Sequence, residues 1–205
     1  MIDTLTSTLN QLFVLTLIPF LVYIIRARKI KGFANYIGLK KSNNKANGLA
    51  LLLMLFLATP LLLFAAVDAS MLEVFQDPKS VTGNIRAMGF GFETVLTILI
   101  VAGIKTSLSE EILFRGFIAK RLIALTGFKT GNLIQAVIFG AIHPLFFLGV
   151  TSNPIFLTII FIAPTIGAYI KVYLNEKLAD GSIVPGWIAH ATGNVMSYTM
   201  IAFVL

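Results

Sequence analysis

Two histidines and a pair of adjacent glutamates are the residues of this sequence best suited to acid–base chemistry. His143 and His190 are its only histidines, and each lies in a long stretch free of Asp, Glu, Lys and Arg. Glu110 and Glu111 form the one adjacent acidic pair. Ionisable groups within apolar segments are energetically costly and by default mark a functional site. These four side chains therefore predict a reaction centre enclosed by apolar segments.

Helical spacing predicts different roles for the two glutamates. Successive residues of an α-helix point ~100° apart, so Glu110 and Glu111 cannot face one point equally. Glu111 and Arg115 are four residues apart and are expected to form an ion pair. Glu110 has no oppositely charged partner at that spacing, which makes it the better candidate for a free catalytic carboxylate. The alternative is a capping or snorkelling carboxylate at a helix end.

The surroundings of His143 also follow from helical spacing. Phe139 precedes His143 by four residues, so its ring is expected to cover one side of the imidazole. Pro144 follows directly and has no amide hydrogen, which should leave the Gly140 carbonyl without its helical partner. We expect a local kink there that opens room for water or substrate.

His190 has a second polar residue on its own helical face. Asn194 lies four residues further on, so both side chains are expected to direct donors toward one point. The small residues Ala189, Ala191 and Gly193 would let neighbouring helices approach closely. Small residues alone indicate packing more often than function, so the prediction depends on the two polar side chains.

The composition indicates that lipid surrounds much of the chain. Hydrophobic residues make up 57% and charged residues 12% of the 205 residues, against roughly half and a quarter in soluble proteins. Mean hydropathy is +0.90. One water-facing core cannot bury so much apolar surface, and the sequence predicts an all-α, polytopic transmembrane bundle with an intramembrane catalytic cavity. The absence of cysteine excludes disulfides and thiolate chemistry.

About six spans are expected from the apolar segments. They lie near Leu5–Ile25, Gly48–Val67, Ala87–Ile104, Gly131–Val150, Ile155–Ile170 and Ser182–Leu205. The third should continue as helix past Arg115, and Glu93, ~25 Å along it from Glu110, is expected near the outer surface. We expect two N-terminal helices with a basic loop over residues 1–87, and a catalytic core of four helices over residues 88–205.

Charges in the loops predict the orientation of the chain. The loop between the first two spans has seven basic residues and no acidic one: Arg26, Arg28, Lys29, Lys31, Lys40, Lys41 and Lys45. This predicts a cytoplasmic loop, whereas Asp68, Glu73 and Asp77 suit the outside. The first span is expected to be a retained anchor rather than a cleaved signal. The net charge of +7 then reflects helix ends and not a nucleic-acid partner, and we expect a plasma-membrane protein whose site faces the cytoplasm.

Three motifs resemble those of the CPBP family, the CAAX-protease and bacteriocin-processing family also called Abi. Ser109–Gly116 resembles its EExxxR motif, Phe139–His143 its FxxxH motif and His190–Asn194 its HxxxN motif. Order and approximate spacing agree, and no motif position departs. The resemblance covers about residues 88–205, and its nearest well-known type is the Ras-converting CAAX endopeptidase.

The resemblance implies an all-helical intramembrane endopeptidase. By motif position, Glu110 and His143 would bind and activate a water molecule, while His190 and Asn194 would stabilise the oxyanion of the tetrahedral intermediate. The chemistry is reasonable, because cleaving a peptide needs a nucleophile, a base and preorganised donors. Without cysteine or a recognisable serine nucleophile motif, water is the expected nucleophile.

The resemblance also implies supporting residues, substrates and partners. Glu111 and Arg115 would order the site, with Phe139 beside them. Substrates would be membrane-associated or lipidated peptides, such as prenylated CAAX proteins, pheromones or bacteriocin leaders. The lipid bilayer is the other expected partner, and no cofactor is implied.

Three other functions compete with this interpretation. Glutamate and histidine are legitimate zinc ligands, so a zinc-dependent membrane protease is the nearest alternative. The chain has no HExxH motif, however, and the resemblance favours a metal-free glutamate mechanism. A non-catalytic bacteriocin self-immunity protein is the second, although the intact motif set argues against it. A transporter or proton-relay protein is the third, but no internal repeat is evident.

Overall fold

The computed structural model describes residues 1–205 and consists of helices without a β-strand. Five helices are long and apolar enough to cross a membrane: Ile2–Ala27, Asn44–Val67, Phe92–Thr126, Phe128–Phe147 and Pro154–Leu178. A sixth, α10 (Val184–Phe203), has a span's length of 20 residues but contains His190 and Asn194. The predicted all-α, polytopic membrane fold is confirmed.

The first two membrane helices are joined by a short, structured loop. They are α1 (Ile2–Ala27) and α3 (Asn44–Val67), and the loop contains α2 (Phe33–Tyr36). Two further short helices, α4 (Ala69–Gln76) and α5 (Val81–Ala87), connect α3 to the third membrane helix. Each is started by a capping side chain, which satisfies amide groups that have no partner within the helix.

The third membrane helix is a continuous 35-residue rod. It comprises α6 (Phe92–Ile100), the π-helical η1 (Val101–Leu108) and η2 (Glu111–Ala119), and α7 (Lys120–Thr126). It begins at Phe92 and not at the predicted Ala87, because Ala87 ends α5 and Gly89 turns the chain with φ +71°. Glu110 lies between the two π-helical stretches. Such segments are rare in proteins, and those that occur are often found at functional sites.

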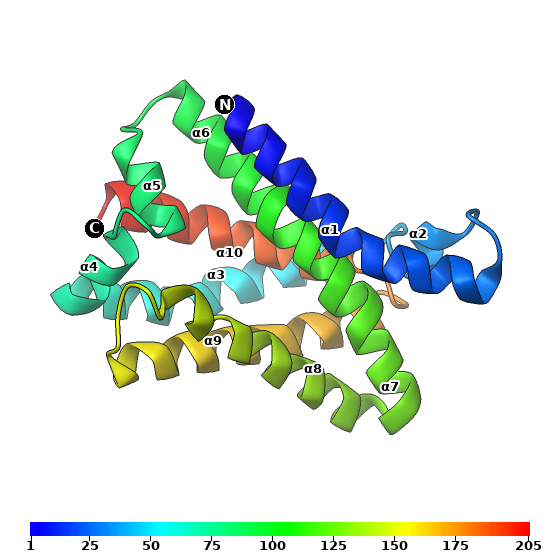
Figure 1. The fold of residues 1–205 in the computed structure, drawn as a ribbon. Helices are drawn as coiled ribbons and strands as arrows, with labels where there is room; N and C mark the ends of the chain where they lie inside the picture. Colours follow the sequence, from blue (N-terminus) through cyan, green and yellow to red (C-terminus); the bar gives the residue numbers. More distant parts are fainter.

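The fourth and fifth helices form an antiparallel pair. They are α8 (Phe128–Ile142), followed by the 3₁₀ turn η3 (Pro144–Phe147), and α9 (Pro154–Tyr173), followed by the π-helical η4 (Leu174–Leu178). The Asn153 side chain caps α9, and Pro154 occupies its first turn, so a new helix does begin between the fourth and fifth predicted spans. Figure 1 shows α8 and α9 side by side, on the side of the bundle away from α1.

The first helix lies along the third membrane helix and runs in the same direction. Gln11 Nε2 donates to the Lys105 carbonyl at 2.8 Å, and Lys105 Nζ lies 3.1 Å from Ser7 Oγ. Near the N-terminus, Figure 1 shows α1 beside α6. Glu93 lies there in the first turn of α6, with a 62% exposed side chain. This matches the expectation that it stands apart from Glu110.

The loops gather at two ends of the bundle that differ in charge. At one end, which we call the basic end, Ile183 N donates to the Gly38 carbonyl and Ser182 Oγ to the Lys40 carbonyl, both at 2.8 Å. The seven basic residues of the first loop are exposed there. At the opposite end the α3–α4–α5 connection packs against the end of α10, and Gln76 donates to the Ile201 carbonyl at 2.9 Å.

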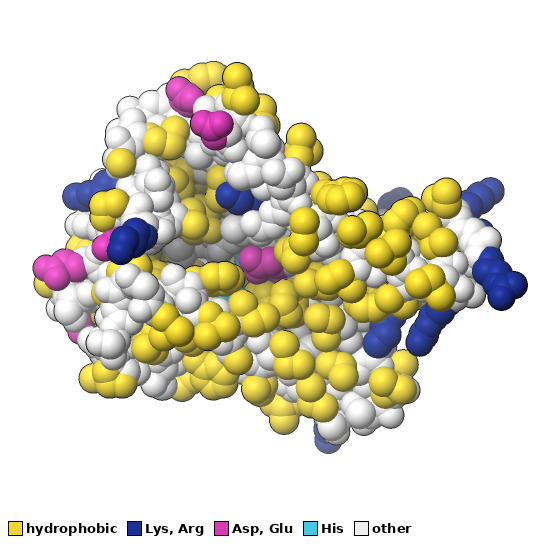
Figure 2. All heavy atoms as spheres, viewed as in Figure 1, with side chains coloured by type: hydrophobic (Ala, Val, Ile, Leu, Met, Phe, Trp, Pro, Cys, Tyr) yellow, Lys and Arg dark blue, Asp and Glu magenta, His cyan; other side chains and the backbone are white.

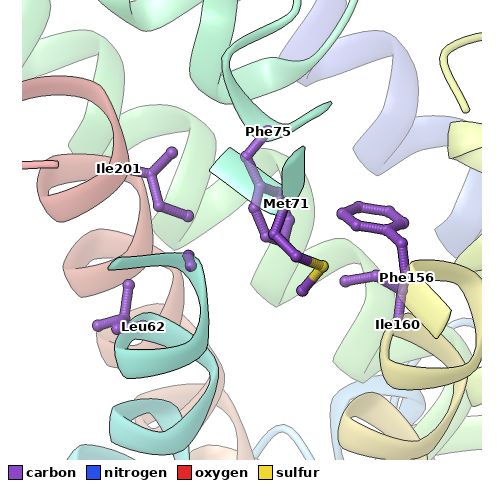
Figure 3. Close-up of a cluster of buried hydrophobic side chains, with 7 residues drawn as sticks. Leu62, Met71, Phe75, Phe156, Ile160 and Ile201 are labelled. Carbon is purple, nitrogen blue, oxygen red and sulfur yellow. The ribbon is translucent and has the colours of Figure 1, made fainter. Parts of the chain in front are cut away.

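The largest buried apolar cluster fixes the end of the bundle opposite the basic end. Figure 3 shows side chains of α3, α4, α9 and α10 converging on one another. The cluster consists of Leu62, Ala65, Met71, Phe75, Phe156, Ile160 and Ile201. In a membrane such contacts stabilise by close van der Waals packing, because lipid tails are as apolar as the side chains. The cluster contains no ionisable side chain, so the candidate site residues lie elsewhere in the bundle.

Candidate active site

Glu111 is the most completely enclosed charged residue of the site. Its side chain is 0% exposed, and its Oε1 atom lies 3.4 Å from Arg115 Nε, 3.1 Å from Lys171 Nζ and 3.0 Å from His190 Nδ1. The predicted proximity of Glu111 and Arg115 is present. The two further partners come from α9 and α10, so one carboxylate oxygen holds three membrane helices together.

Glu110 has a different environment from its neighbour. Its side chain is 17% exposed, and no Lys or Arg lies within ion-pair distance of it. Its Oε2 atom is 3.8 Å from His190 Nε2, which is too long for a direct hydrogen bond. The two glutamates thus approach opposite nitrogens of one imidazole, Glu111 at Nδ1 and Glu110 at Nε2.

The contact with Glu111 determines the tautomer of His190. An ionised carboxylate only accepts hydrogen bonds, so Nδ1 of His190 carries the proton and donates it to Glu111. In the neutral ring Nε2 is then an acceptor that faces Glu110. His190 can offer an Nε2–H to an oxyanion only as imidazolium, a requirement that spacing along the helix does not reveal.

His143 lies where α8 ends. Its Nδ1 atom is 2.7 Å from the Phe139 carbonyl oxygen, so Nδ1–H is the donor and Nε2 is left as an acceptor. The Phe139 ring lies 4.6 Å from the His143 ring, centroid to centroid. The predicted loss of a partner for the Gly140 carbonyl is wrong, because His143 N donates to it at 3.1 Å. The helix tightens into the 3₁₀ turn that begins at Pro144.

The ring of Phe139 is the centre around which the site is assembled. The guanidinium carbon of Arg115 lies 3.9 Å from the ring centroid, and Lys171 Nζ lies 5.1 Å from it. The imidazoles of His143 and His190 are 4.6 and 6.0 Å away. Cations are attracted to the face of an aromatic ring. Phe139 therefore brings the motif residues of η2, α8 and α10 together.

The side-chain amide of Asn194 is already used in hydrogen bonds that its spacing from His190 does not predict. Its Nδ2 atom donates to Thr106 Oγ1 at 2.9 Å and to Ser107 Oγ at 3.2 Å. Both amide hydrogens are used in this way, so Asn194 does not share a target with His190 in this structure. To donate to a substrate oxygen, it must exchange one of these hydroxyl partners.

Sequence reasoning missed several residues that shape the site. Lys171 is 4% exposed and contacts Glu111. In the sequence it lies near the end of an apolar segment, a position that predicts an interfacial lysine and not a buried one. Asn175 Oδ1 accepts the Gly186 amide at 2.8 Å. A Cβ atom on Gly186 would lie 2.8 Å from Glu111 Oε2, so only glycine lets α10 begin against that carboxylate. These contacts join residues far apart in the chain, and no local pattern predicts them.

The surface of the molecule has two further features. The face seen in Figure 2 has a hollow, with acidic and basic side-chain atoms at its edges and hydrophobic side chains nearby. A separate apolar groove of about 410 Å³ lies between α3 and α9. Its lining contains no ionisable group: Leu57, Pro60, Leu61, Phe64, Ile159, Ile162, Ala163 and Ile166. The groove can hold an apolar chain but supplies no acid or base.

The donor groups are not arranged as a metal centre. No group of three or more His, Cys, Asp or Glu side chains is placed to hold a metal ion. Glu111 Oε1 is taken up by Arg115, Lys171 and His190. The arrangement is that of a buried carboxylate–histidine network beside a partly exposed carboxylate.

Comparison with protein families shows which family the chain belongs to. The model of the type II CAAX prenyl endopeptidase Rce1-like family matches residues 92–196, half of the chain. The chain belongs to this family. No curated protein and no solved structure matches it. The Rce1-like match runs from α6 into α10 and includes all three motifs, whereas α1 and α3 lie outside it.

Membership of the Rce1-like family establishes the general activity. The family consists of CAAX prenyl endopeptidases, and the chain forms several membrane helices. The protein is therefore a multi-pass membrane protease, as the motifs predict.

Proposed function

We propose that this protein is a glutamate-dependent intramembrane endopeptidase in which Glu110 is the general base. The observation that carries the proposal is the contrast between the two glutamates. Glu111 is fully enclosed and bound by two cations, whereas Glu110 is partly exposed and has no Lys or Arg partner. A general base must be free to take and return a proton, and only Glu110 meets this requirement.

The first step is attack by water on the peptide carbonyl. Glu110 takes one proton from the water molecule, and the acceptor Nε2 of His143 holds its other hydrogen. The water oxygen bonds to the carbonyl carbon, and the carbonyl electron pair moves onto oxygen. His190, after taking up a proton from solvent to become imidazolium, and Asn194 would donate to that oxyanion. Charge-assisted hydrogen bonds are stronger than neutral ones, which favours exchange of a hydroxyl partner of Asn194 for the oxyanion.

The second step is collapse of the tetrahedral intermediate. Protonated Glu110 returns its proton to the departing amide nitrogen. The carbon–nitrogen bond breaks, the carbonyl re-forms, and the products are a carboxylic acid and an amine. Glu110 is then again a carboxylate, so the cycle consumes one water molecule per bond and needs no covalent enzyme intermediate.

We propose prenylated or otherwise membrane-anchored peptides as the substrate class. The family model describes CAAX prenyl endopeptidases, and the apolar groove between α3 and α9 suits a lipidated segment. We further propose a plasma-membrane location with the basic end in the cytoplasm, which brings the site within reach of cytoplasmic substrates. The seven exposed basic residues of the first loop support this orientation.

The test uses the purified protein in lipid nanodiscs and a matched pair of peptides. Both carry the same CAAX sequence and an internally quenched fluorophore, and only one is farnesylated on its cysteine. We expect cleavage of the farnesylated peptide, at a kcat/KM at least ~10-fold above that of the other. Glu110→Gln protein is the background control. Equal cleavage of both would reject the prenyl requirement, and failure to cleave either would reject the proposed substrate class.

A further inference from the structure

The buried charges of the site form a balanced set that includes one residue outside the three motifs. Glu110 and Glu111 carry two negative charges, and Arg115 and Lys171 carry two positive charges. In the resting site, before His190 is protonated for catalysis, both histidines are neutral and the set sums to zero. Lys171 supplies half of the positive charge, although the proposed mechanism gives it no task.

We propose that Lys171 is a positioning residue of the peptidase site, which holds Glu111 and, through it, the imidazole of His190. Its Nζ atom lies 3.1 Å from Glu111 Oε1, the same oxygen that accepts the Nδ1–H of His190 at 3.0 Å. Lys171 comes from α9, Glu111 from η2 and His190 from α10. The proposal rests on the peptidase function, and it extends the site to a helix that carries no motif.

The burial of Lys171 shows that it is directed inward. It lies in the last turn of α9, where a lysine usually extends its chain toward the interface. Its side chain is only 5% exposed and lies over the Phe139 ring, 5.1 Å from the centroid. Lys177, six residues further on, is exposed and lies 4.4 Å from the centroid of Phe128. Two lysines that lie six residues apart on one helix are thus in different environments, Lys171 buried and Lys177 exposed.

Charge balance explains why the buried position of Lys171 matters for the site. An unpaired charge in a low-dielectric interior is strongly unfavourable. With Arg115 as the only cation, two ionised glutamates would leave the site with a net negative charge. Lys171 removes this imbalance, so Glu111 can stay a carboxylate that orients His190 while Glu110 remains a carboxylate that can act as a base. Lys171 does not contact Glu110 or the reacting atoms, which is why its role is positioning.

The catalytic test compares two substitutions at this position. Lys171→Met keeps an unbranched chain that is one heavy atom shorter and removes the charge, whereas Lys171→Arg keeps the charge. We expect kcat for Lys171→Met to fall at least ~10-fold with KM changed less than ~2-fold, and Lys171→Arg to retain clearly more of kcat. Lys177→Met is the matched control and should resemble the wild type. Wild-type kcat in Lys171→Met, or equal losses in both variants, would overturn the proposal.

A second measurement does not depend on peptidase activity. The thermal stabilities of Lys171→Met, Glu111→Gln and the double variant are compared in the same nanodiscs. Each single change leaves an unbalanced buried charge, so the double variant should be more stable than the sum of the single effects predicts. Additive effects would overturn the proposal. A wild type that cleaves no peptide would reject the proposed function while this coupling still tests Lys171.

Discussion

His190 Nδ1 donates to Glu111 Oε1 across 3.0 Å, which links α10 to the third membrane helix through a fully buried carboxylate. This bond fixes which nitrogen of the ring carries the proton. It also explains how two adjacent glutamates serve separate tasks. Glu111 belongs to the framework that orients the imidazole, and Glu110 remains available for proton transfer.

Replacing Glu110 by Gln should abolish proteolysis and leave the fold intact. The amide keeps the size of the side chain but cannot accept the proton, and no Lys or Arg pair is broken. Activity should fall by at least ~10²-fold, the usual low end for the loss of a general base. Glu93→Gln is the matched control on the same helix, because Glu93 is 62% exposed and remote from the site. Near-wild-type turnover by folded Glu110→Gln protein would remove Glu110 from the mechanism.

Glu111→Gln should destabilise the protein more than Arg115→Ala. Motif spacing alone predicts similar effects, but Lys171 also contacts Glu111. Loss of the carboxylate leaves two buried cations facing Glu110 alone, whereas loss of Arg115 leaves the Lys171 pair in place. Removing one partner of a buried pair typically costs about 3–5 kcal/mol. Thermal unfolding of both single variants and the double variant measures the order and the coupling, and the absence of coupling would contradict the ion pair.

We predict that activity does not require a stoichiometric metal ion. The side chains are not placed as a group of three ligands, and Glu111 is bound by neighbouring donors. A chelator should leave the cleavage rate unchanged, and elemental analysis should find far less than one zinc per chain. One zinc per chain, with activity lost to the chelator and restored by zinc, would replace the glutamate mechanism by a zinc-dependent one.

Single cysteines should report the sidedness of the site, since the native chain has none. Substitutions at Asn44 and Lys177, both exposed at the basic end, should be shielded from an impermeant thiol reagent in intact cells. A cysteine at the exposed Lys79 should be labelled. Ser182 is a poor reporter because it is fully buried whichever side it faces. The reverse labelling pattern would place the site toward the outside.

Gly140→Ala should separate α8 from α9 and reduce both stability and activity. A Cβ atom there would collide with the Thr165 side chain and lie 2.7 Å from the Phe161 carbonyl oxygen. His143 is one helical turn from Gly140, so a movement of α8 that relieves this collision would displace the His143 ring. Gly167→Ala in α9 is the matched control, because nothing lies within 4 Å of its Cβ position. In a helix that change should be neutral or stabilise by up to ~1 kcal/mol. Equal thermal stability of the two variants would show that the contact is unimportant.

The features predictable from sequence are those that depend on neighbours along the chain. Four-residue spacing predicts the proximity of Glu111 and Arg115, and of Phe139 and His143, because one helical turn joins them. Apolar length predicts which segments form membrane helices, although some ends differ by five to eight residues. The same reasoning fails for Asn194, since its hydroxyl partners belong to another helix.

Lys171 shows most clearly where such reasoning ends. In the sequence it is one cation near the end of an apolar segment, which is the common pattern of a helix end. Its role depends on the side that α9 presents to Glu111 and Phe139, and that side is fixed by packing between helices. Similarly, the tautomer of His190 depends on a partner 79 residues away.

The contacts between α3 and α10 have a consequence for how this protein can be divided. Gly193 of α10 lies against Met54 of α3, and the loop carbonyl of Gly38 accepts the Ile183 amide at the start of α10. Both partners precede the stretch that the family model matches. The segment that the family model matches is therefore shorter than the set of helices that pack against one another. A minimal protease consisting of residues 92–196 would lack the α3 surface that packs against α10, the helix that carries His190. It would also lack the Gly38 carbonyl that accepts the Ile183 amide at the start of α10.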